Sequence, residues 1–294
     1  MPALIEDGPH DGIASDICPN CHSRRIRHFD YSDATIHVCR NCKLQWASFH
    51  QTGGFVSLEN RSAAHERYMD PNLVDTPSYR PYREFWRTLR YIRGDTSLKV
   101  LDIGCGNGLF ISECVRRGHD AHGVDADISN QRLIDPEMRE RVTFCRAENL
   151  PPDDERYDLI TFWDSFEHMP EPFLLLELLA TRLKPDGIIF LRVNDQRDIV
   201  NWTAKLALSL NSHFGKKLFR ICFNLPHHYW NFSHRTMEQM LKRIEWHIIF
   251  ARSTETPANR LFASRMLRAF VLLAYAINTL FAGGKIREYF IRPK

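Results

Sequence analysis

The sequence predicts an α/β fold built on a doubly wound, mostly parallel sheet, with a small cysteine-rich module in front of it. Apolar runs typical of strands alternate with helical patterns from residue 97 to residue 193, as they do in parallel sheets. Three glycines at alternate positions, Gly104, Gly106 and Gly108, form a turn after the first of these strands. The 294 residues, 44% of them apolar, suffice for one large domain and one small module.

Charge and cysteine content exclude several classes of protein. The net charge of +3 is too small for a chain that binds nucleic acid over its whole surface. Four of the eight cysteines form two CxxC pairs and the others are scattered, which argues against a disulfide framework and for a reducing compartment. The first ten residues lack the basic and apolar runs of a signal peptide, so we expect a cytoplasmic protein.

After a loose tail over residues 1–15, the N-terminal part predicts a zinc ribbon over residues 16–48. Two CxxC pairs separated by 17 residues supply the four thiolates of a closed, structural zinc site, namely Cys18, Cys21, Cys39 and Cys42. A strand over residues 36–39 should lead into the second pair. We expect the metal to stabilise a module too small for its own core. A role in gripping the substrate is the second interpretation.

A linker is expected over residues 49–78, and a helix follows it over residues 79–93. Aromatic and aliphatic side chains recur in this helix at three- and four-residue steps, which indicates a face that packs on the core. The alternative is a lid over a ligand held by the glycine-rich turn.

The residues around the glycines indicate a nucleotide-like ligand. The first strand, residues 97–103, carries Asp102 near its end, and a helix over residues 109–117 follows the turn. The second strand, residues 121–124, runs into Asp125, which can accept hydrogen bonds from both hydroxyls of a ribose. The glycine spacing is GxGxG, whereas dinucleotide-binding loops have GxGxxG.

The later elements continue the alternation. Strands are expected at residues 142–145, 157–163 and 188–193, with a helix at 173–183 and a turn at 184–187. Ser233 should N-cap a helix over residues 234–243. Two final strands are expected at residues 245–252 and 286–291, the last of them antiparallel to the rest.

Over about residues 80 to 252, the chain resembles class I S-adenosylmethionine (SAM)-dependent methyltransferases of the ubiquinone-biosynthesis type. The segments that carry the resemblance are Val-Leu-Asp-Ile-Gly-Cys-Gly-Asn-Gly (100–108), Gly-Val-Asp (123–125), Ala-Glu-Asn-Leu-Pro (147–151), Phe-Glu-His-Met-Pro-Glu-Pro (166–172), Leu-Lys-Pro-Asp-Gly (183–187) and His-His-Tyr-Trp-Asn-Phe-Ser (227–233). The resemblance implies a Rossmann-like fold and SAM as the cofactor.

The resemblance also implies roles for the turn and the first two strands. The backbone of Gly104, Cys105 and Gly106 should face the methionine part of SAM. Asp102 should hold the methionine amino group, and Asp125 should bind the ribose.

The resemblance assigns contacts with the adenine and with the far side of the methionine to residues later in the chain. Ala147, through its backbone, and Glu148 should lie beside the adenine. Arg146 stands where many relatives have an acid, so Glu148 would have to substitute for it. Trp163 and Asp164 should close over the methionine side, and packing in the core is an equal alternative for Trp163.

Methyl transfer from a sulfonium is an in-line displacement that needs alignment and often a general base for the acceptor hydroxyl. His168 lies just beyond the fourth strand, and a histidine can take a hydroxyl proton near neutral pH. The resemblance to sugar and quinone O-methyltransferases makes His168 our first choice for that base. A positioning role is the alternative. Asn194, His228 and Asn231 are expected to line the acceptor side, although His228 could instead bridge the backbone across a turn.

Two helical inserts, residues 198–223 and 261–282, combine apolar residues with lysines and arginines. The apolar part of the second is about a dozen residues, short of the roughly 20 that span a bilayer. We therefore expect peripheral contact with the inner face of a membrane, with packing in the protein core or a dimer interface as the alternative.

The leading hypothesis is an enzyme that O-methylates a hydroxyl of a saccharide, quinone or lipid-linked precursor near a membrane. An RNA methyltransferase that docks through the zinc ribbon is a second hypothesis, although the near-neutral charge makes nucleic acid an unfavourable partner. A non-catalytic binding protein that keeps the SAM fold is the third.

Overall fold

The computed structural model describes residues 16–50, 79–151, 155–197, 199–209, 213–255, 257, 265–281 and 284–294. The expected tail over residues 1–15 lies outside the described residues, and so does the expected linker except for its first two positions.

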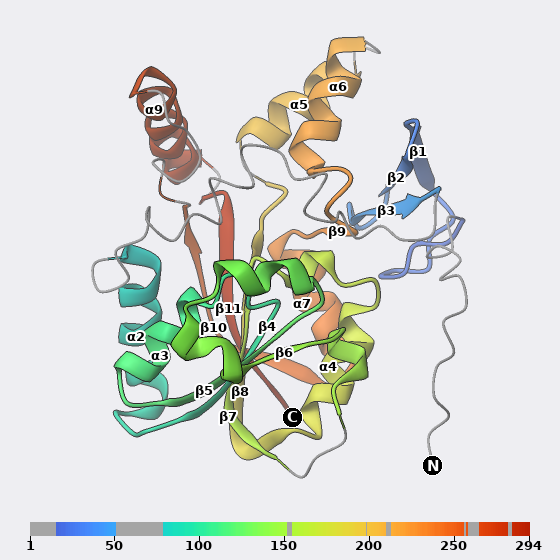
Figure 1. Ribbon diagram of the computed structural model, residues 1–294. Helices are drawn as coiled ribbons and strands as arrows, with labels where there is room; N and C mark the ends of the chain where they lie inside the picture. Colours follow the sequence, from blue (N-terminus) through green and yellow to red (C-terminus); the bar gives the residue numbers. More distant parts are fainter. Residues whose placement is uncertain are drawn as a thin grey trace.

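A seven-stranded sheet forms the centre of the molecule, in the order β10-β11-β8-β7-β4-β5-β6 (Figure 1). Its strands are β4 (Lys99–Ile103), β5 (Asp120–Asp125), β6 (Val142–Phe144), β7 (Tyr157–Trp163), β8 (Leu183–Asn194), β10 (Trp246–Thr254) and β11 (Ile286–Pro293). Strands β4 to β8 pair in parallel, and β11 lies antiparallel between β8 and β10. The predicted doubly wound sheet with an antiparallel last strand is confirmed.

Helices cover both faces of this sheet (Figure 1). On one side lie α2 (Arg80–Arg93) and α3 (Leu109–Arg116), and on the other lie α4 (Pro172–Ala180) and α7 (His234–Arg243). Short 3-10 helices occupy the connections: η3 (Ile128–Leu133), η4 (Pro136–Arg141), η5 (Ala147–Asn149) and η6 (Phe166–His168). The predicted N-cap of α7 is confirmed, because the Ser233 side chain accepts a hydrogen bond from the backbone N–H of Thr236.

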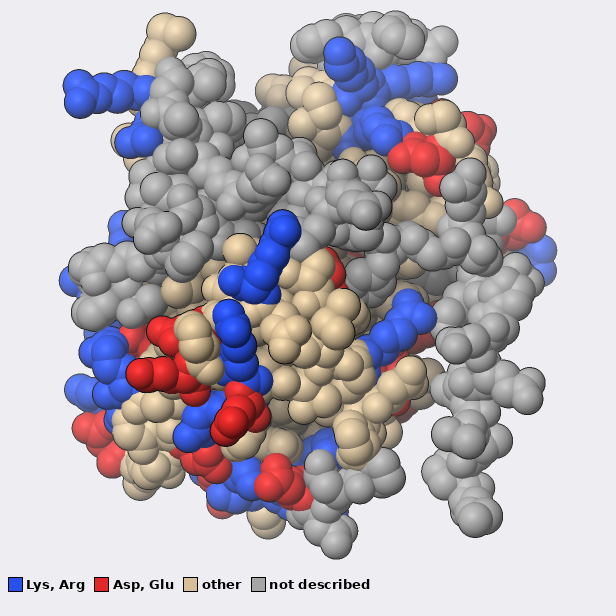
Figure 2. All heavy atoms as spheres, viewed as in Figure 1, with Lys and Arg blue, Asp and Glu red and all other residues tan. Residues whose placement is uncertain are grey.

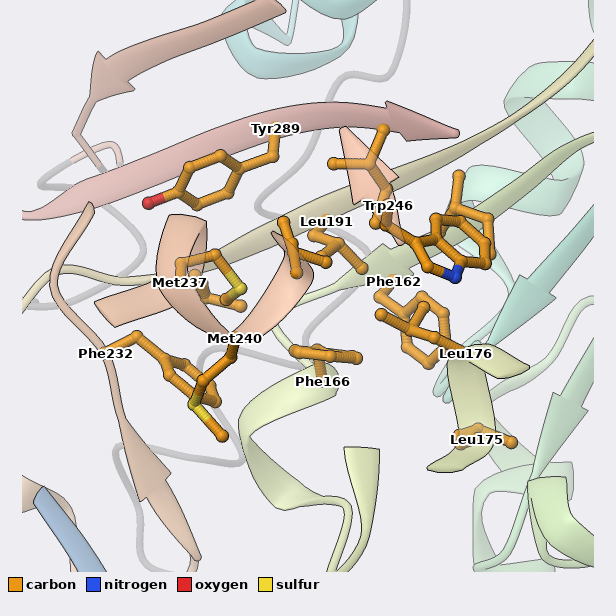
Figure 3. Packing of buried hydrophobic residues seen from close by; sticks show 14 of the residues in the cluster. Phe162, Phe166, Leu175, Leu176, Leu191, Phe232, Met237, Met240, Trp246 and Tyr289 are labelled. Atoms are coloured by element: carbon orange, nitrogen blue, oxygen red, sulfur yellow. The ribbon is translucent and has the colours of Figure 1, made fainter. Parts of the chain in front are cut away.

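Each face has its own hydrophobic core. Under α2, the side chains of Tyr82, Phe85 and Trp86 pack on Phe110 of α3 and Phe190 of β8, which confirms the core-facing stripe. Figure 3 shows the opposite core, where side chains from the strands meet those of η6, α4 and α7. It includes Phe162, Phe166, Leu176, Leu191, Phe232, Met237, Trp246 and Tyr289.

The expected turn at residues 184–187 is a bulge within β8. Tyr157 of β7 pairs with Leu183, and Leu159 pairs with Ile188, so the four residues between them leave the regular register. Lys184 forms an ion pair from the bulge to Asp158 of β7, with Nζ and Oδ2 2.6 Å apart. The chain does turn at these residues, but the segments on both sides of the turn pair with the same strand, β7.

A second, smaller sheet has the order β1-β2-β3-β9 and is antiparallel throughout. Its strands are β1 (Ile26–Asp30), β2 (Ala34–Cys39), β3 (Gln45–Phe49) and β9 (Trp230–Asn231). The first three belong to the cysteine-rich segment, and β2 confirms the strand expected before the second cysteine pair. Neither β3 nor β9 was expected, and β9 comes from the methyltransferase-like part of the chain.

The cysteine-rich segment shares a core with the large sheet. Cys18, Cys39, Cys42 and Trp46 are buried in the same hydrophobic cluster as residues of η6, β9 and α7. Polar contacts cross the same boundary, because the Asn20 amide donates to Oε1 of Gln239 at 2.8 Å. The ribbon therefore packs as part of the large domain and not as a separate domain.

The first helical insert, α5 (Ile199–Ser209) and α6 (His213–Phe223), lies against the ribbon. Ala204, Leu208, Phe219 and Phe223 pack on the face of the small sheet. Arg220 also pairs with Asp33 of the ribbon, with Nη2 and Oδ2 2.7 Å apart. Much of the apolar surface of this insert is thus buried within the protein.

The second insert, α9 (Arg265–Phe281), connects β10 to β11, as expected from their positions in the sequence. It projects with α5 and α6 from the same end of the molecule (Figure 1). Within the described residues, none of the helices has the length and apolar content that crossing a membrane requires.

Helix α4 provides a test of the core. Leu176 is fully buried and Leu174 is 58% exposed on the same helix. Replacing Leu176 with Ala should lower the free energy of unfolding by about 2–5 kcal/mol, because it removes buried methyl groups and leaves a cavity. Leu174→Ala should change it by about 0.5 kcal/mol or less. Urea unfolding of both variants measures the difference, and equal losses would contradict the described packing of α4.

Candidate functional site

The glycine-rich turn lies where the carboxyl ends of β4 and β7 meet. Gly104, Gly106 and Gly108 have φ values of 72°, 55° and 71°, a region that favours glycine. A Cβ added at Gly104 would lie 2.6 Å from Cβ of Ser165, which follows β7. Ser165 in turn donates a hydrogen bond to the carbonyl of Ile103 at 2.6 Å. The turn therefore keeps its backbone close to the next strand with no side chain between.

Asp102 is a buried carboxylate at this edge, only 2% exposed. Its register partner on β7 is Thr161, whose hydroxyl donates to Oδ1 at 2.6 Å. The pKa of Asp102 is raised to about 7. Burial is the main cause and the nearby Asp125 carboxylate acts in the same direction, whereas the hydrogen bond from Thr161 lowers the pKa. A cation placed beside Asp102 would relieve this cost.

Asp125 ends β5 beside the same turn. Its Oδ2 accepts from the backbone N–H of Gly106 at 2.7 Å, and Oδ1 accepts from Asp127 and Asn130 at 2.8 and 3.1 Å. Burial raises its pKa, and these hydrogen bonds lower it. Each carboxylate oxygen has two lone pairs, so Oδ2 retains one for a further donor.

The other predicted cofactor residues surround this turn in different ways. Cys105 is buried, and its Sγ would lie 2.8 Å from a Cβ added at Gly123 of β5, so it packs between turn and sheet. Ala147 is buried at the start of η5, and Glu148 is partly exposed beside it. Both follow β6, the strand next to β5.

Trp163 belongs to the core under α2. Its ring packs on Tyr82, Phe85, Phe110 and Phe190 with centroids 4.7–5.4 Å apart. This contact supports the packing alternative for its side chain. Its buried Nε1 has no hydrogen-bond partner among the described residues.

Asp164, the next residue, has a φ of 55° and forms an ion pair with Arg192 of β8. Arg192 also approaches Glu288 of β11, with Nε and Oε1 3.6 Å apart, and Glu288 bonds to Arg252 of β10. Arg192 and Glu288 are buried. Our sequence analysis missed this network, although an arginine within the apolar strand 188–193 was a signal for it.

His168 is held by the segment that precedes β9. Its Nδ1 lies 2.8 Å from the carbonyl oxygen of His227. A carbonyl only accepts, so Nδ1 carries the proton and Nε2 has the lone pair in the neutral ring. Burial lowers the pKa of His168 to about 4, so the ring is neutral at pH 7.

Two further ionisable groups adjoin His168. The His228 ring packs edge-on against it with centroids 4.7 Å apart, and Nε2 of His228 accepts from the Asn224 amide at 2.9 Å. Glu167 is 1% exposed, and its carboxylate oxygens have no hydrogen-bond partner among the described residues. Burial raises the pKa of Glu167 to about 8. One potential metal-ligating atom each of Glu167, His168 and His228 lies within 4.8 Å of the others.

The two predicted asparagines occupy different positions. Asn194 ends β8, and its backbone lies near the Glu167 carboxyl, so it adjoins the same group of residues. Asn231 is buried in β9, and its amide donates to Oε1 of Gln45 in β3 at 3.1 Å. The amide nitrogen of Asn231 thus faces the ribbon. That Asn231 lines the site of the methyl acceptor stays a prediction.

The four N-terminal cysteines converge within 4.8 Å of one another. The two CxxC pairs form turns of the same shape. His22 N–H donates to the Cys18 carbonyl and Lys43 N–H to the Cys39 carbonyl, and both donors have positive φ. Four convergent sulfurs on two equivalent turns are compatible with a tetrahedral zinc site.

Comparison with known proteins identifies the large domain. Residues 77–249, more than half of the chain, match the family model described as "Methyltransferase domain". The chain belongs to this methyltransferase family.

Curated relatives of this methyltransferase include ubiquinone biosynthesis O-methyltransferases. That of Histophilus somni is 25% identical over 148 residues, which cover 45% of this chain and 60% of the relative. That of Coxiella burnetii is 31% identical over 110 residues, which cover 35% and 47%. The matches thus span about half the length of these relatives.

Solved structures show the same fold. A SAM-dependent methyltransferase from Clostridium acetobutylicum has a TM-score of 0.50 at 12% identity, covering 78% of this chain and 97% of that one. A putative sarcosine dimethylglycine methyltransferase from Galdieria sulphuraria has a TM-score of 0.50 at 17% identity, covering 71% and 84%.

The residues at the carboxyl edge fit SAM, which supplies an electrophilic methyl group when bound. Asp102 is a buried carboxylate whose raised pKa indicates an uncompensated charge, and the methionine ammonium would compensate it. The backbone at Gly104 to Gly106 has no side chain to obstruct a close ligand, apart from the inward-packed Cys105. The lone pair left on Asp125 suits a ribose hydroxyl.

The pKa of Asp102 predicts how SAM affinity depends on pH. The ammonium binds the ionised carboxylate, so affinity should rise with pH up to about 7 and then level off. Below pH 7 each unit should lower it by up to about tenfold. Calorimetric titration of SAM between about pH 5.5 and pH 7.5 measures this.

Asp102→Asn should bind SAM more weakly, and its affinity should not vary with pH over that range. Asp120→Asn, at the exposed opposite end of β5, is the control and should behave like the wild type. An affinity of the wild type that is independent of pH would show that Asp102 does not hold the ammonium.

Proposed function

We propose that this methyltransferase transfers the methyl group of SAM to a hydroxyl, with His168 as the general base. The observation that carries the proposal is the hydrogen bond from Nδ1 of His168 to the His227 carbonyl, which leaves Nε2 as the proton acceptor of the neutral ring. The O-methyltransferase relatives support a hydroxyl as the acceptor.

The electrostatics around His168 favour a neutral base. Its own pKa is about 4, and burial keeps Glu167 largely protonated at pH 7 because the pKa of that carboxyl is about 8. No charge therefore has to be removed from the ring before it accepts the hydroxyl proton. The neutral ring can hold the hydroxyl in line with the methyl group and take its proton as the methyl group is transferred.

A membrane-associated acceptor is the second part of the proposal, and we propose a saccharide, quinone or lipid-linked precursor. The helices α5, α6 and α9 project from the end of the molecule that carries the ribbon and β9 (Figure 1). Large apolar side chains are exposed on them: Trp202, Leu206, Ile221, Met266, Leu272 and Leu273.

Basic residues accompany this apolar surface. Figure 2 shows Lys and Arg side chains over this end of the molecule, and Lys216, Lys217 and Arg265 are exposed there. Apolar residues that enter the lipid interface beside cations that meet anionic headgroups are the pattern of a peripheral membrane contact. We also propose that the four cysteines hold a structural zinc ion.

Labelled SAM provides the test of the acceptor class. The protein is incubated with methyl-labelled SAM and either a bacterial lipid extract or bulk RNA. Label that enters the organic phase and resists mild alkali, as an ether does and an ester does not, supports the proposal. Label in RNA would favour the RNA methyltransferase, and SAM binding without turnover on any extract would favour a non-catalytic protein.

The base can be tested in the same assay. His168→Gln retains an amide donor for the His227 carbonyl and lacks a proton acceptor of comparable strength. Its turnover at saturating SAM should fall by about 100-fold or more, with SAM affinity unchanged. The wild-type rate should be flat between about pH 5.5 and pH 7, because the pKa of His168 is about 4 and that of the adjoining Glu167 is about 8. His119→Gln, at the opposite end of the sheet, should be fully active, and an active His168→Gln would remove the base assignment.

The membrane contact predicts a loss of binding when α9 becomes charged. A variant with both Leu272→Asp and Leu273→Asp should bind vesicles of phosphatidylethanolamine and phosphatidylglycerol at least about tenfold more weakly, because two exposed leucines no longer enter the lipid. Co-sedimentation measures this. Leu174→Asp on α4, equally exposed, is the control. Equal sedimentation of the α9 variant and the wild type would refute the contact.

A further inference from the structure

The small sheet and the catalytic histidine are joined through five consecutive residues, 227–231. One edge of this segment pairs with the ribbon. Gln45 and Trp46 of β3 are register partners of Asn231 and Trp230, and Ala47 N–H donates to the Tyr229 carbonyl at 2.9 Å. The amide of Asn231 adds a side-chain hydrogen bond to Gln45.

The same segment holds η6 on its other side. The His227 carbonyl accepts from Nδ1 of His168, and Tyr229 N–H donates to the Glu167 carbonyl at 3.0 Å. Trp230 Nε1 lies 3.0 and 3.2 Å from the carbonyls of Met169 and Pro170. The residues that position His168 therefore have a β-strand of the ribbon as their support.

The second cysteine pair sets the position of that strand. Cys39 ends β2, Cys42 comes three residues before β3, and Cys39 N–H donates to the Leu44 carbonyl at 2.9 Å. The turn between β2 and β3 is thus the turn that carries Cys39 and Cys42. A hairpin of this size has little stability of its own.

β9 has only two residues and cannot hold its position alone. If β3 moved away, the Tyr229 carbonyl and the buried Asn231 amide would lose their partners. Each such loss would leave a buried polar group without its hydrogen bond, which is unfavourable. Among the described residues, hydrogen bonds join Ile103, Gly106 and Asp102 to Ser165, Asp125 and Thr161, which belong to the large sheet and its loops.

We propose that the four-cysteine ribbon, when it binds zinc, is a positioning element of the active site. Zinc fixes the β2–β3 turn, β3 fixes β9, and the residues before β9 hold His168 with its proton on Nδ1 and its lone pair on Nε2. Gln45 and Asn231 act as positioning residues in this arrangement through the hydrogen bond between their side chains. The inference uses the proposed function only in naming His168 as the base.

The two ring nitrogens of His168 report the tautomer directly, so no acceptor is needed for the test. We would record ring ¹⁵N shifts of histidine-labelled full-length protein, with His168→Gln to assign the signal among 14 histidines. The samples are the zinc-loaded wild type, the same protein after chelation, the chelated protein with zinc restored, and zinc-loaded Gln45→Ala. Arg27→Ala, on the exposed edge strand β1, is the control.

Chelation should convert His168 from a single Nδ1–H form to averaged tautomers, and added zinc should restore the original signal. Gln45→Ala should shift the signal in the same direction, and Arg27→Ala should not. SAM affinity measured by calorimetry should change less than about twofold in all samples, because the described hydrogen bonds of Asp102, Gly106 and Asp125 lie within the large sheet and its loops.

Unchanged His168 signals in both the chelated protein and Gln45→Ala would overturn the inference. It would also be overturned if Gln45→Ala changed SAM affinity by more than about twofold, since the ribbon would then support the whole fold and not His168 in particular. If the signals respond as expected but no hydroxyl is methylated, the proposed function fails and the positioning role stands.

Discussion

The close approach of the β4 and β7 ends is the constraint on which the cofactor side depends. Gly104 can lie against Ser165 only because it lacks a Cβ, and Ser165 ties the two strands through the Ile103 carbonyl. The parallel register places Asp102 opposite Thr161, which supplies its hydrogen bond. The chain then runs from Ser165 directly into η6, so the same contact sets where Glu167 and His168 begin.

Several buried ionisable groups lie together at this edge. Asp102 and Glu167 have raised pKa values and His168 has a lowered one, in each case mainly because burial disfavours the charged form. Arg192 and Glu288 extend the pattern beneath the edge as a buried ion pair. A buried ion pair adds little net stability, but removing one partner costs much free energy. Arg192 also pairs with Asp164, so the buried pair helps to keep Asp164 in its conformation with positive φ.

The ribbon changes how the domains of this chain are understood. Its cysteine spacing predicts a small zinc-stabilised module that a linker joins to the large domain, whereas its third strand pairs with β9 and its buried cysteines belong to the core of the large domain. The first helical insert covers the other face of the small sheet. Three segments far apart in sequence thus form one body, and the exposed apolar surface left for a membrane is smaller than the sequence suggested.

The sequence by itself determined the alternation of strands and helices with an antiparallel last strand, the SAM turn with Asp102 and Asp125, the N-cap of α7 and the four-cysteine set. These features are local: each follows from a periodicity, a spacing or a turn within about 20 residues. The tertiary structure alone decided that His227 holds His168, that β3 pairs with β9, that Arg192 meets Glu288 and that the bulge at 184–187 stays within β8. Most of these contacts join residues that are far apart in the chain. A pattern within a single sequence does not indicate which distant strand edge or buried charge will be the partner.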